Sequence, residues 1–436
     1  MKALTPVALA GAFLLSNLSH AADWPQWRGP AFNGSTDETH LPVAFSKTDG
    51  VVWNLDLPGP SASTPAVVGD RIFLSTSHQT NRTMHAMALD RKTGKLLWEK
   101  KIADGFNRDN RSNFSSPSPV ADATRVFFFY GNGPLVAFDH SGKELWARNI
   151  AKEYGEFAFQ WTFSATPLLF GGKLYVQVLQ RDVAVQGRGK ATGNESFLLA
   201  LDPATGKELW RQLRPNDAVA ESKEAYTTPM PVTHNGRTEI VIAGGDCLTG
   251  HDPATGKELW RWGTWNPTKI GHWRLVPSAV YGAGVILACA PKGDPIFAIK
   301  AGGNGTLTDA GIAWKGDKRV VSADVPTPLF YQGDFFVLNE GKKNISRVDP
   351  ATGEPKWTLA LPGLKKYEAS PTGADGKIYV MSFAGDVVVI DAQKGTILGQ
   401  AAMGESGDDF IRSTIVASHG QLLIRTNTKL FCIGKR

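Results

Sequence analysis

The nonapeptide DPATGKELW at residues 202–210 is the most informative stretch for the fold, because it returns unchanged at residues 252–260. Further copies keep an aspartate, a turn glycine and a tryptophan in the same order, at residues 90–98, 139–146 and 349–357. The aspartate can accept backbone N–H groups, and glycine allows the positive φ that a tight hairpin needs. Each copy therefore predicts a hairpin followed by a strand whose tryptophan packs between neighbouring sheets.

Decayed copies of this phrase end at Trp314 and at Leu398. A second phrase precedes each copy, and it combines Ser, Thr or Pro with a following turn and a hydrophobic strand. It occurs eight times, at residues 63–65, 116–117, 165–167, 227–229, 276–278, 326–328, 369–371 and 412–414. Repeats of 40–50 residues with several short strands are typical of propellers. The sequence predicts an all-β, eight-bladed propeller of four-stranded antiparallel blades over residues 51–436.

The last unit ends without a tryptophan strand, and a spare one stands at the opposite end of the repeats, at residues 51–57. We expect this N-terminal strand to close the ring beside residues 429–433, because closure removes exposed sheet edges. The interval from Trp146 to Trp210 is unusually long, and its polar excess at residues 180–196 is interpreted as a loop on one face. Residues 22–50 are a non-repetitive lead, in which Trp24 and Trp27 are expected to plug against the ring.

Residues 1–21 are typical of a secretory signal, with Lys2, an apolar run and small residues before a predicted cleavage after Ala21. This predicts a periplasmic or secreted protein without a transmembrane segment. The charge of +6 is spread along the chain, so a nucleic-acid partner is not expected. The chain is expected to be a monomer. Cys247, Cys289 and Cys432 lie in apolar stretches and are predicted to be mainly buried free thiols.

The Asp-x-x-Thr-Gly-Lys-x-x-Trp phrase resembles the repeat of the PQQ-type propeller family over roughly residues 50–433. That family includes quinoprotein dehydrogenases and the outer-membrane assembly propeller BamB. The opening WPQWRGP at residues 24–30 also resembles the start of exported bacterial propellers of this repeat type. The resemblance implies the fold, but the same ring serves both enzymes and scaffolds.

The resemblance implies two alternative functions, and each requires different residues. The dehydrogenases have adjacent cysteines over the quinone, acidic and amide ligands for calcium, and a catalytic aspartate. This chain has no adjacent cysteines, and no calcium triad is found by motif. We therefore expect a non-catalytic, BamB-like binding or scaffolding protein of the cell envelope, without a cofactor or metal. The alternative is a PQQ-dependent dehydrogenase of alcohols or sugars.

A carbohydrate-active enzyme is a further alternative, with Glu368 and either Asp408 or Asp409 as its two carboxyl groups. The partner expected for the main prediction is an envelope protein, an extended peptide or a glycan.

Residues that precede each innermost strand should line one mouth of the central channel. The candidate ligand-binding residues chosen by this rule are Arg111, Asn113, Trp161, Tyr226, His272, Trp273, Arg274, Tyr367, Glu368 and Arg412. Aromatic and arginine side chains suit a sugar face, a peptide or an anion. An equally weighted interpretation is that Arg274, Glu368 and Arg412 form a structural ion-pair ring.

Overall fold

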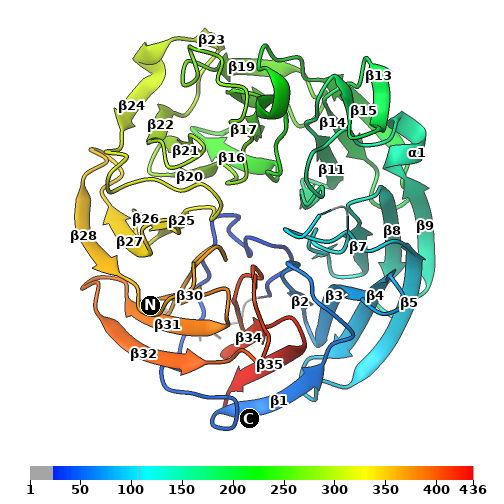
Figure 1. Ribbon diagram of the computed structural model, residues 1–436, viewed down its shortest axis with the longest axis vertical. Helices are drawn as coiled ribbons and strands as arrows, with labels where there is room; N and C mark the ends of the chain where they lie inside the picture. Colours follow the sequence, from blue (N-terminus) through cyan, green and yellow to red (C-terminus); the bar gives the residue numbers. More distant parts are fainter. Residues whose placement is uncertain (1–22, 108, 436) are drawn as a thin grey trace, which may run out of the picture.

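The computed structural model describes residues 23–107 and 109–435, so the predicted signal segment lies outside the described residues. Eight antiparallel sheets stand around a central axis, which confirms the predicted eight-bladed propeller (Figure 1). Neighbouring innermost strands contact one another around that axis. None of the helices in the described part of the chain has the length and apolar character that a bilayer crossing needs.

The first four blades follow the chain from the inner strand outward. Blade 1 contains β2 (Ala66–Val68), β3 (Arg71–His78), β4 (Thr83–Asp90) and β5 (Leu96–Asp104). Blade 2 contains β6 (Val120–Ala121), β7 (Arg125–Phe129), β8 (Pro134–Asp139) and β9 (Glu144–Asn149). Blade 3 contains β10 (Leu168–Phe170), β11 (Lys173–Val178), β14 (Phe197–Leu201) and β15 (Glu208–Leu213). Blade 4 contains β16 (Met230–His234), β17 (Arg237–Gly244), β18 (Cys247–His251) and β19 (Glu258–Trp262).

The remaining blades continue the same order. Blade 5 contains β20 (Val280–Gly282), β21 (Val285–Cys289), β22 (Ile296–Lys300) and β24 (Ile312–Lys315). Blade 6 contains β25 (Leu329–Tyr331), β26 (Asp334–Asn339), β27 (Asn344–Val348) and β28 (Pro355–Ala360). Blade 7 contains β29 (Thr372–Ala374), β30 (Lys377–Met381), β31 (Asp386–Asp391) and β32 (Ile397–Ala402). Blade 8 contains β33 (Val416–Ser418), β34 (Gln421–Arg425), β35 (Lys429–Gly434) and β1 (Val51–Asp56).

The ring closes as predicted, because β1 supplies the outer strand of blade 8 (Figure 1). The two strands are antiparallel, with Trp53 opposite Cys432 and Asp56 opposite Lys429. Residues from the two ends of the repeat region thus share one sheet, and the outer edge of β35 is covered. A closed ring of this kind leaves no blade without neighbours on both sides.

Six of the seven repeat tryptophans pack on the turn glycine of the next blade, whereas Trp260 packs on Gly250 of its own blade and donates to Glu239. A Cβ atom added to Gly206 would meet the Trp146 ring at 2.6 Å, and one added to Gly94 would meet Trp53 at 2.5 Å. The indole Nε1 of Trp146 also donates to the carbonyl oxygen of Pro203, at 3.0 Å. The Thr-Gly turn and the tryptophan are therefore two halves of one inter-blade contact.

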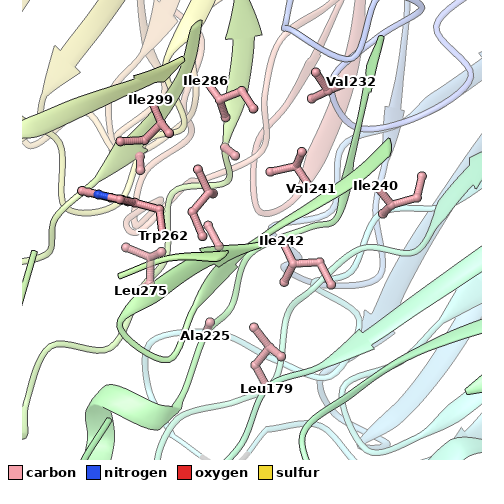
Figure 2. Close-up of a cluster of buried hydrophobic side chains, with 14 of the residues drawn as sticks. Leu179, Ala225, Val232, Ile240, Val241, Ile242, Trp262, Leu275, Ile286 and Ile299 are labelled. Atoms are coloured by element: carbon pink, nitrogen blue, oxygen red, sulfur yellow. The ribbon is translucent and has the colours of Figure 1, made fainter. Parts of the chain in front are cut away.

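Hydrophobic side chains fill the spaces between the sheets. Figure 2 shows such a cluster in the region of blades 3 to 5, where Ile240 and Ile242 of β17 and Ile286 of β21 are fully buried. Cys247, Cys289 and Cys432 are buried and free, as expected. This packing makes the inner parts of the blades a rigid frame for the side chains at the channel.

Three local features differ from the simple repeat. The excess at residues 180–196 is a hairpin of β12 (Val183–Val185) and β13 (Arg188–Thr192) rather than an irregular loop. β23 (Gly305–Leu307) leaves blade 5 and pairs in parallel with β19 of blade 4, which explains the decayed fifth copy. The helical residues form α1 (Ile150–Tyr154) and 3-10 turns at Ala220–Lys223 and Asp309–Gly311.

The lead packs against the ring, as predicted for Trp24 and Trp27. Trp24 is fully buried and forms an isolated bridge with Val67 of the first inner strand. Arg28 is also buried, and it donates to the carbonyl oxygens of Pro328 and Pro371 at 2.8 and 3.3 Å. Burial lowers the pKa of Arg28 to about 9. The lead therefore attaches to blades that are far apart in sequence.

Candidate functional site

A belt of hydroxyl groups surrounds the channel at the start of the innermost strands. One serine or threonine from each blade belongs to it: Thr64, Ser118, Thr166, Thr228, Ser278, Thr327, Ser370 and Thr414. At seven of the eight junctions a backbone N–H donates to the hydroxyl oxygen of the next blade, at 2.9–3.2 Å. The Ser/Thr/Pro phrase of the repeat thus builds a polar belt from residues that the sequence places in eight separate units.

A cavity of about 400 Å³ opens above this belt. This volume is within the range of small-molecule sites. Its lining contains five cationic side chains, namely Arg111, Arg274, Lys292, Lys366 and Arg412. It contains three carboxyl groups, from Asp324, Glu340 and Glu368. The cavity therefore has an excess of positive charge, and it favours an anionic ligand.

One wall of the cavity joins Arg274, Asp324 and Glu340. Arg274 and Asp324 form an ion pair at 3.1 Å, and the backbone N–H of Lys292 also donates to Asp324, at 2.7 Å. Burial opposes ionisation of Asp324, but the charge and hydrogen bond of Arg274 outweigh it, so the pKa of Asp324 is lowered. Asp324 is therefore a fixed negative charge.

The pKa of Glu340 shifts in the opposite direction from that of Asp324. Its Oε2 accepts the backbone N–H of Asp324 at 3.3 Å, and its side chain is buried. Burial, with the negative charges of Asp324 and Glu368, raises the pKa of Glu340 to about 7. A carboxyl group with this pKa can take up or release a proton near neutral pH.

The opposite wall carries Arg412, Glu368, Arg111 and Trp161. Arg412 Nε donates to Glu368 Oε2 at 2.8 Å, and an Arg412 Nη1 group donates to the carbonyl oxygen of Arg111. The Arg111 guanidinium lies 5.6 Å from the centre of the Trp161 ring. This wall therefore presents an aromatic surface beside two guanidinium groups.

The Trp161 ring is held by a buried polar network. Its Nε1 donates to Glu221 at 2.9 Å, and its backbone N–H donates to the Tyr226 hydroxyl at 3.2 Å. Tyr226 in turn donates to Glu224 Oε2, at 2.6 Å. Burial raises the pKa of both Glu224 and Tyr226. The network fixes the aromatic plane at the cavity.

The predicted mouth residues divide into two groups. Six line the cavity: Arg111, Trp161, Tyr226, Arg274, Glu368 and Arg412. Asn113, His272, Trp273 and Tyr367 are not among the lining residues. Asn113 caps its own turn by accepting from Ser115, and the Tyr367 hydroxyl donates to Pro362, so both have structural partners. His272 is exposed, and the backbone of the adjacent Trp273 is tied to Ser222.

The predicted ion-pair ring is two separate pairs, Arg274–Asp324 and Arg412–Glu368. The carboxyl pair considered for a carbohydrate-active enzyme does not form at the cavity. Asp409 pairs with Lys365 at 2.9 Å, and Asp408 accepts the backbone N–H of Glu405 at 2.7 Å. Neither aspartate lines the cavity with Glu368.

Several lining residues were missed by the sequence rule. Asp324 lies three residues before Thr327, in the same segment in which Arg274 lies four residues before Ser278. The rule could have found it. Glu340 follows β26 and Lys292 follows β21. Both reach the cavity from outside the segments that precede the innermost strands. Trp27 comes from the lead and donates to Thr414 Oγ1 at 3.3 Å.

The side chains of the cavity suit a quinone cofactor in part. Cationic groups, hydroxyls and the Trp161 plane fit a flat aromatic quinone that carries carboxylates. The described lining contains no cysteine, so adjacent cysteines over the ring plane are not part of this site. Both oxygens of Asp324 accept from the Arg274 guanidinium, so this carboxylate is not free to bind a hard cation.

The comparisons with known proteins agree on the propeller. A family model described as outer membrane protein assembly factor BamB matches residues 35–195, 158–304 and 308–434. Among solved structures, a europium-containing methanol dehydrogenase has a TM-score of 0.69 at 12% identity and covers 95% of this chain and 98% of that chain. BamB from Moraxella catarrhalis has a TM-score of 0.60 at 13% identity and covers 88% of this chain and 99% of that chain.

The curated relatives are dehydrogenases. Polyvinylalcohol dehydrogenase of Sphingopyxis sp. (strain 113P3) is 28% identical over 212 residues, which is 45% of this chain and 29% of that protein. Quinohemoprotein alcohol dehydrogenase of Comamonas testosteroni is 25% identical over 219 residues, which is 46% of this chain and 27% of that protein. The matched part of the chain thus spans less than a third of the length of these relatives. The prediction of a non-catalytic binding or scaffolding protein is contradicted by this set of relatives and is wrong.

Proposed function

The chain belongs to the PQQ-type propeller family described as outer membrane protein assembly factor BamB, and from this premise we propose that it is a quinone-dependent dehydrogenase of alcohols. The observation that carries the proposal is the cation-rich cavity on the propeller axis, with a carboxyl group of raised pKa in its wall. The dehydrogenases among its relatives support the same assignment.

The cationic side chains would hold the carboxylates of pyrroloquinoline quinone. Arg111, Lys292 and Lys366 are exposed at the cavity, so their charges are available to a ligand. Arg274 and Arg412 are each paired with an acidic side chain, so their charges are already balanced. They would orient the quinone rather than neutralise its carboxylates. Trp161 offers a face for the ring system. When bound, the quinone supplies the two-electron acceptor that alcohol oxidation requires.

Glu340 is the proposed proton acceptor for the substrate hydroxyl. A general base works best when its pKa lies near the working pH, and the pKa of Glu340 is raised to about 7. One of its oxygens already accepts the Asp324 N–H, which leaves the other for the alcohol. Asp324, held ionised by Arg274, keeps Glu340 from losing its proton at lower pH.

Binding of the quinone is testable without turnover. We expect the protein to bind pyrroloquinoline quinone with Ca²⁺ present and to reduce an artificial electron-accepting dye when a primary alcohol is added. Lys366→Ala should weaken quinone binding by about tenfold, because one charge contact to a carboxylate is lost. The measurement is a fluorescence titration, followed by dye reduction.

Lys365→Ala is the matched control, because Lys365 is an exposed neighbour that pairs with Asp409 and does not line the cavity. It should bind the quinone like the unmodified protein. Equal weakening in both variants would indicate a non-specific charge effect. Absence of quinone binding in the unmodified protein would refute the proposal.

We also propose that the enzyme works outside the cytoplasm. The segment at residues 1–21 supports this, with its charge, apolar run and predicted cleavage after Ala21. N-terminal sequencing of the exported protein should begin at Ala22. A start at Met1 in the mature protein would contradict the proposed export.

A further inference from the structure

A second site lies in blade 1, away from the central cavity. Three side chains with metal-binding atoms meet there: His78 at the end of β3, His85 in β4 and Glu99 in β5. One ligand atom from each lies within 4.8 Å of the other two. In the part of the chain that the structure describes, this is the one such group of three His, Cys, Asp or Glu residues. All three side chains are half-buried.

The strand register brings these residues together. Thr76 of β3 faces His85, and Met87 of β4 faces Glu99, so the three side chains rise from adjacent strands of one sheet. Met87 and Leu89 on the same face of β4 pack in one cluster with Cys432 of the closing blade. The group therefore sits on the side of blade 1 that faces the closure of the ring.

Two imidazoles converge on one carboxylate oxygen. His78 Nε2 lies 2.7 Å from Glu99 Oε1, and His85 Nδ1 lies 2.8 Å from the same atom. The 2.8 Å approach of His85 Nδ1 to this oxygen does not have the geometry of a regular hydrogen bond among the described residues. A bare imidazole nitrogen and a carboxylate oxygen repel each other unless a proton or a metal cation lies between them.

The second ring nitrogen of His85 has a partner of its own. Nε2 lies 2.9 Å from Thr83 Oγ1, where an Nε2–H can donate. In that tautomer the Nδ1 lone pair faces Glu99, and such a hydrogen bond to the far nitrogen is what orients metal-bound histidines. The rings of His78 and His85 are 4.0 Å apart at their centres, so two positive charges here would repel.

We propose that His78, His85 and Glu99 bind a late first-row divalent cation, of which Zn²⁺ is the best match. Two imidazoles and a carboxylate are typical zinc ligands, whereas Ca²⁺ and Mg²⁺ prefer oxygen ligands alone. Three protein ligands leave a fourth position for water. Tetrahedral zinc needs its ligand atoms about 3.3 Å apart, which these half-exposed side chains reach by small rotations.

This site is independent of the proposed quinone cavity, so its test does not depend on dehydrogenase activity. Untagged protein is stripped with EDTA, dialysed against micromolar Zn²⁺ and analysed for bound zinc. We expect about one equivalent per chain in the unmodified protein. His78→Gln and Glu99→Gln should each weaken zinc affinity by about a hundredfold or more, and Thr83→Val by about tenfold.

The matched control is His40→Asn, which removes an exposed histidine from the lead and keeps a residue that tolerates the positive φ there. It should retain zinc like the unmodified protein. Zinc should also raise the melting temperature of the unmodified protein by several degrees, and not that of Glu99→Gln. Circular dichroism checks that each variant is folded.

Crystals of the unmodified protein give a readout that needs no variant. Anomalous scattering at the zinc edge should place the ion between His78, His85 and Glu99. An ion bound elsewhere, no retained zinc, or equal retention in all variants would overturn the proposal.

Discussion

Glu340 is the side chain in the cavity whose protonation changes near neutral pH. If it takes the proton of the alcohol, Glu340→Gln should lower kcat by about a hundredfold or more, because an amide cannot act as a base. Quinone affinity should stay within about twofold, since no positive charge is removed. Steady-state dye reduction and fluorescence titration separate the two effects. Glu354→Gln, at an exposed turn, is the control.

The same carboxyl group predicts a pH dependence of stability. Its pKa is raised from an ordinary value of 4.5 to about 7 in the fold, so the folded state binds the proton more tightly than the unfolded state. The contribution of this carboxyl group to the free energy of unfolding is therefore fully present below pH 4.5. This contribution, up to about 3 kcal/mol, is lost as the pH rises through 7. Glu340→Gln should remove this loss. Its melting temperature relative to the unmodified protein should therefore rise between pH 5 and pH 8; a constant difference would contradict the assignment.

At the scale of the element, the Thr-Gly turn and the tryptophan of the preceding blade form one contact. Gly206 has φ +69°, and a methyl group there would lie 2.6 Å from the Trp146 ring. Gly206→Ala should therefore cost about 1–3 kcal/mol for the displaced ring, in addition to about 1 kcal/mol for the left-handed backbone. Thermal unfolding measures the sum.

Gly236→Ala separates the two costs. Gly236 has φ +77°, but no atom lies within 4 Å of the position that its Cβ would take. This variant should show the backbone cost alone. Equal destabilisation of the two variants would mean that the contact between tryptophan and turn contributes little.

At the scale of the whole molecule, stability depends on the closure of blade 8 by β1. Trp53 packs on Gly94 of blade 1 and donates to the carbonyl oxygen of Arg91 at 2.8 Å, so this strand joins the first and last blades. Replacing residues 51–57 by a glycine-serine segment of equal length should lower the melting temperature by roughly 10 °C. The exposed edge of β35 should also promote aggregation.

Light scattering during thermal unfolding tests both effects. A chain that melts at an unchanged temperature and stays monomeric would show that the ring does not need β1. The closure was visible in the sequence because a complete tryptophan strand was missing at one end and present at the other.

The candidate site was only partly predictable. Arg274, Glu368 and Arg412 follow from a position rule, because each precedes an innermost strand of its blade. Glu340 and Lys292 come from the far ends of other strands, and the order of residues alone does not show that they reach the cavity. Adjacent cysteines are a contiguous motif, and their absence does not exclude activity at a site that is assembled from several blades.

The number of blades, the tryptophan packing and the strand that closes the ring are all readable from the order of residues. These features repeat along the chain, and each depends on local turn chemistry and strand pairing. The three-dimensional arrangement was needed to see that Asp324 lies beside Glu340, that β23 joins blade 4, and that His78, His85 and Glu99 meet. Such contacts depend on strand register and on loop paths through the ring. A shift of one residue would turn the same side chains to the opposite face, and no repeated signal fixes that choice.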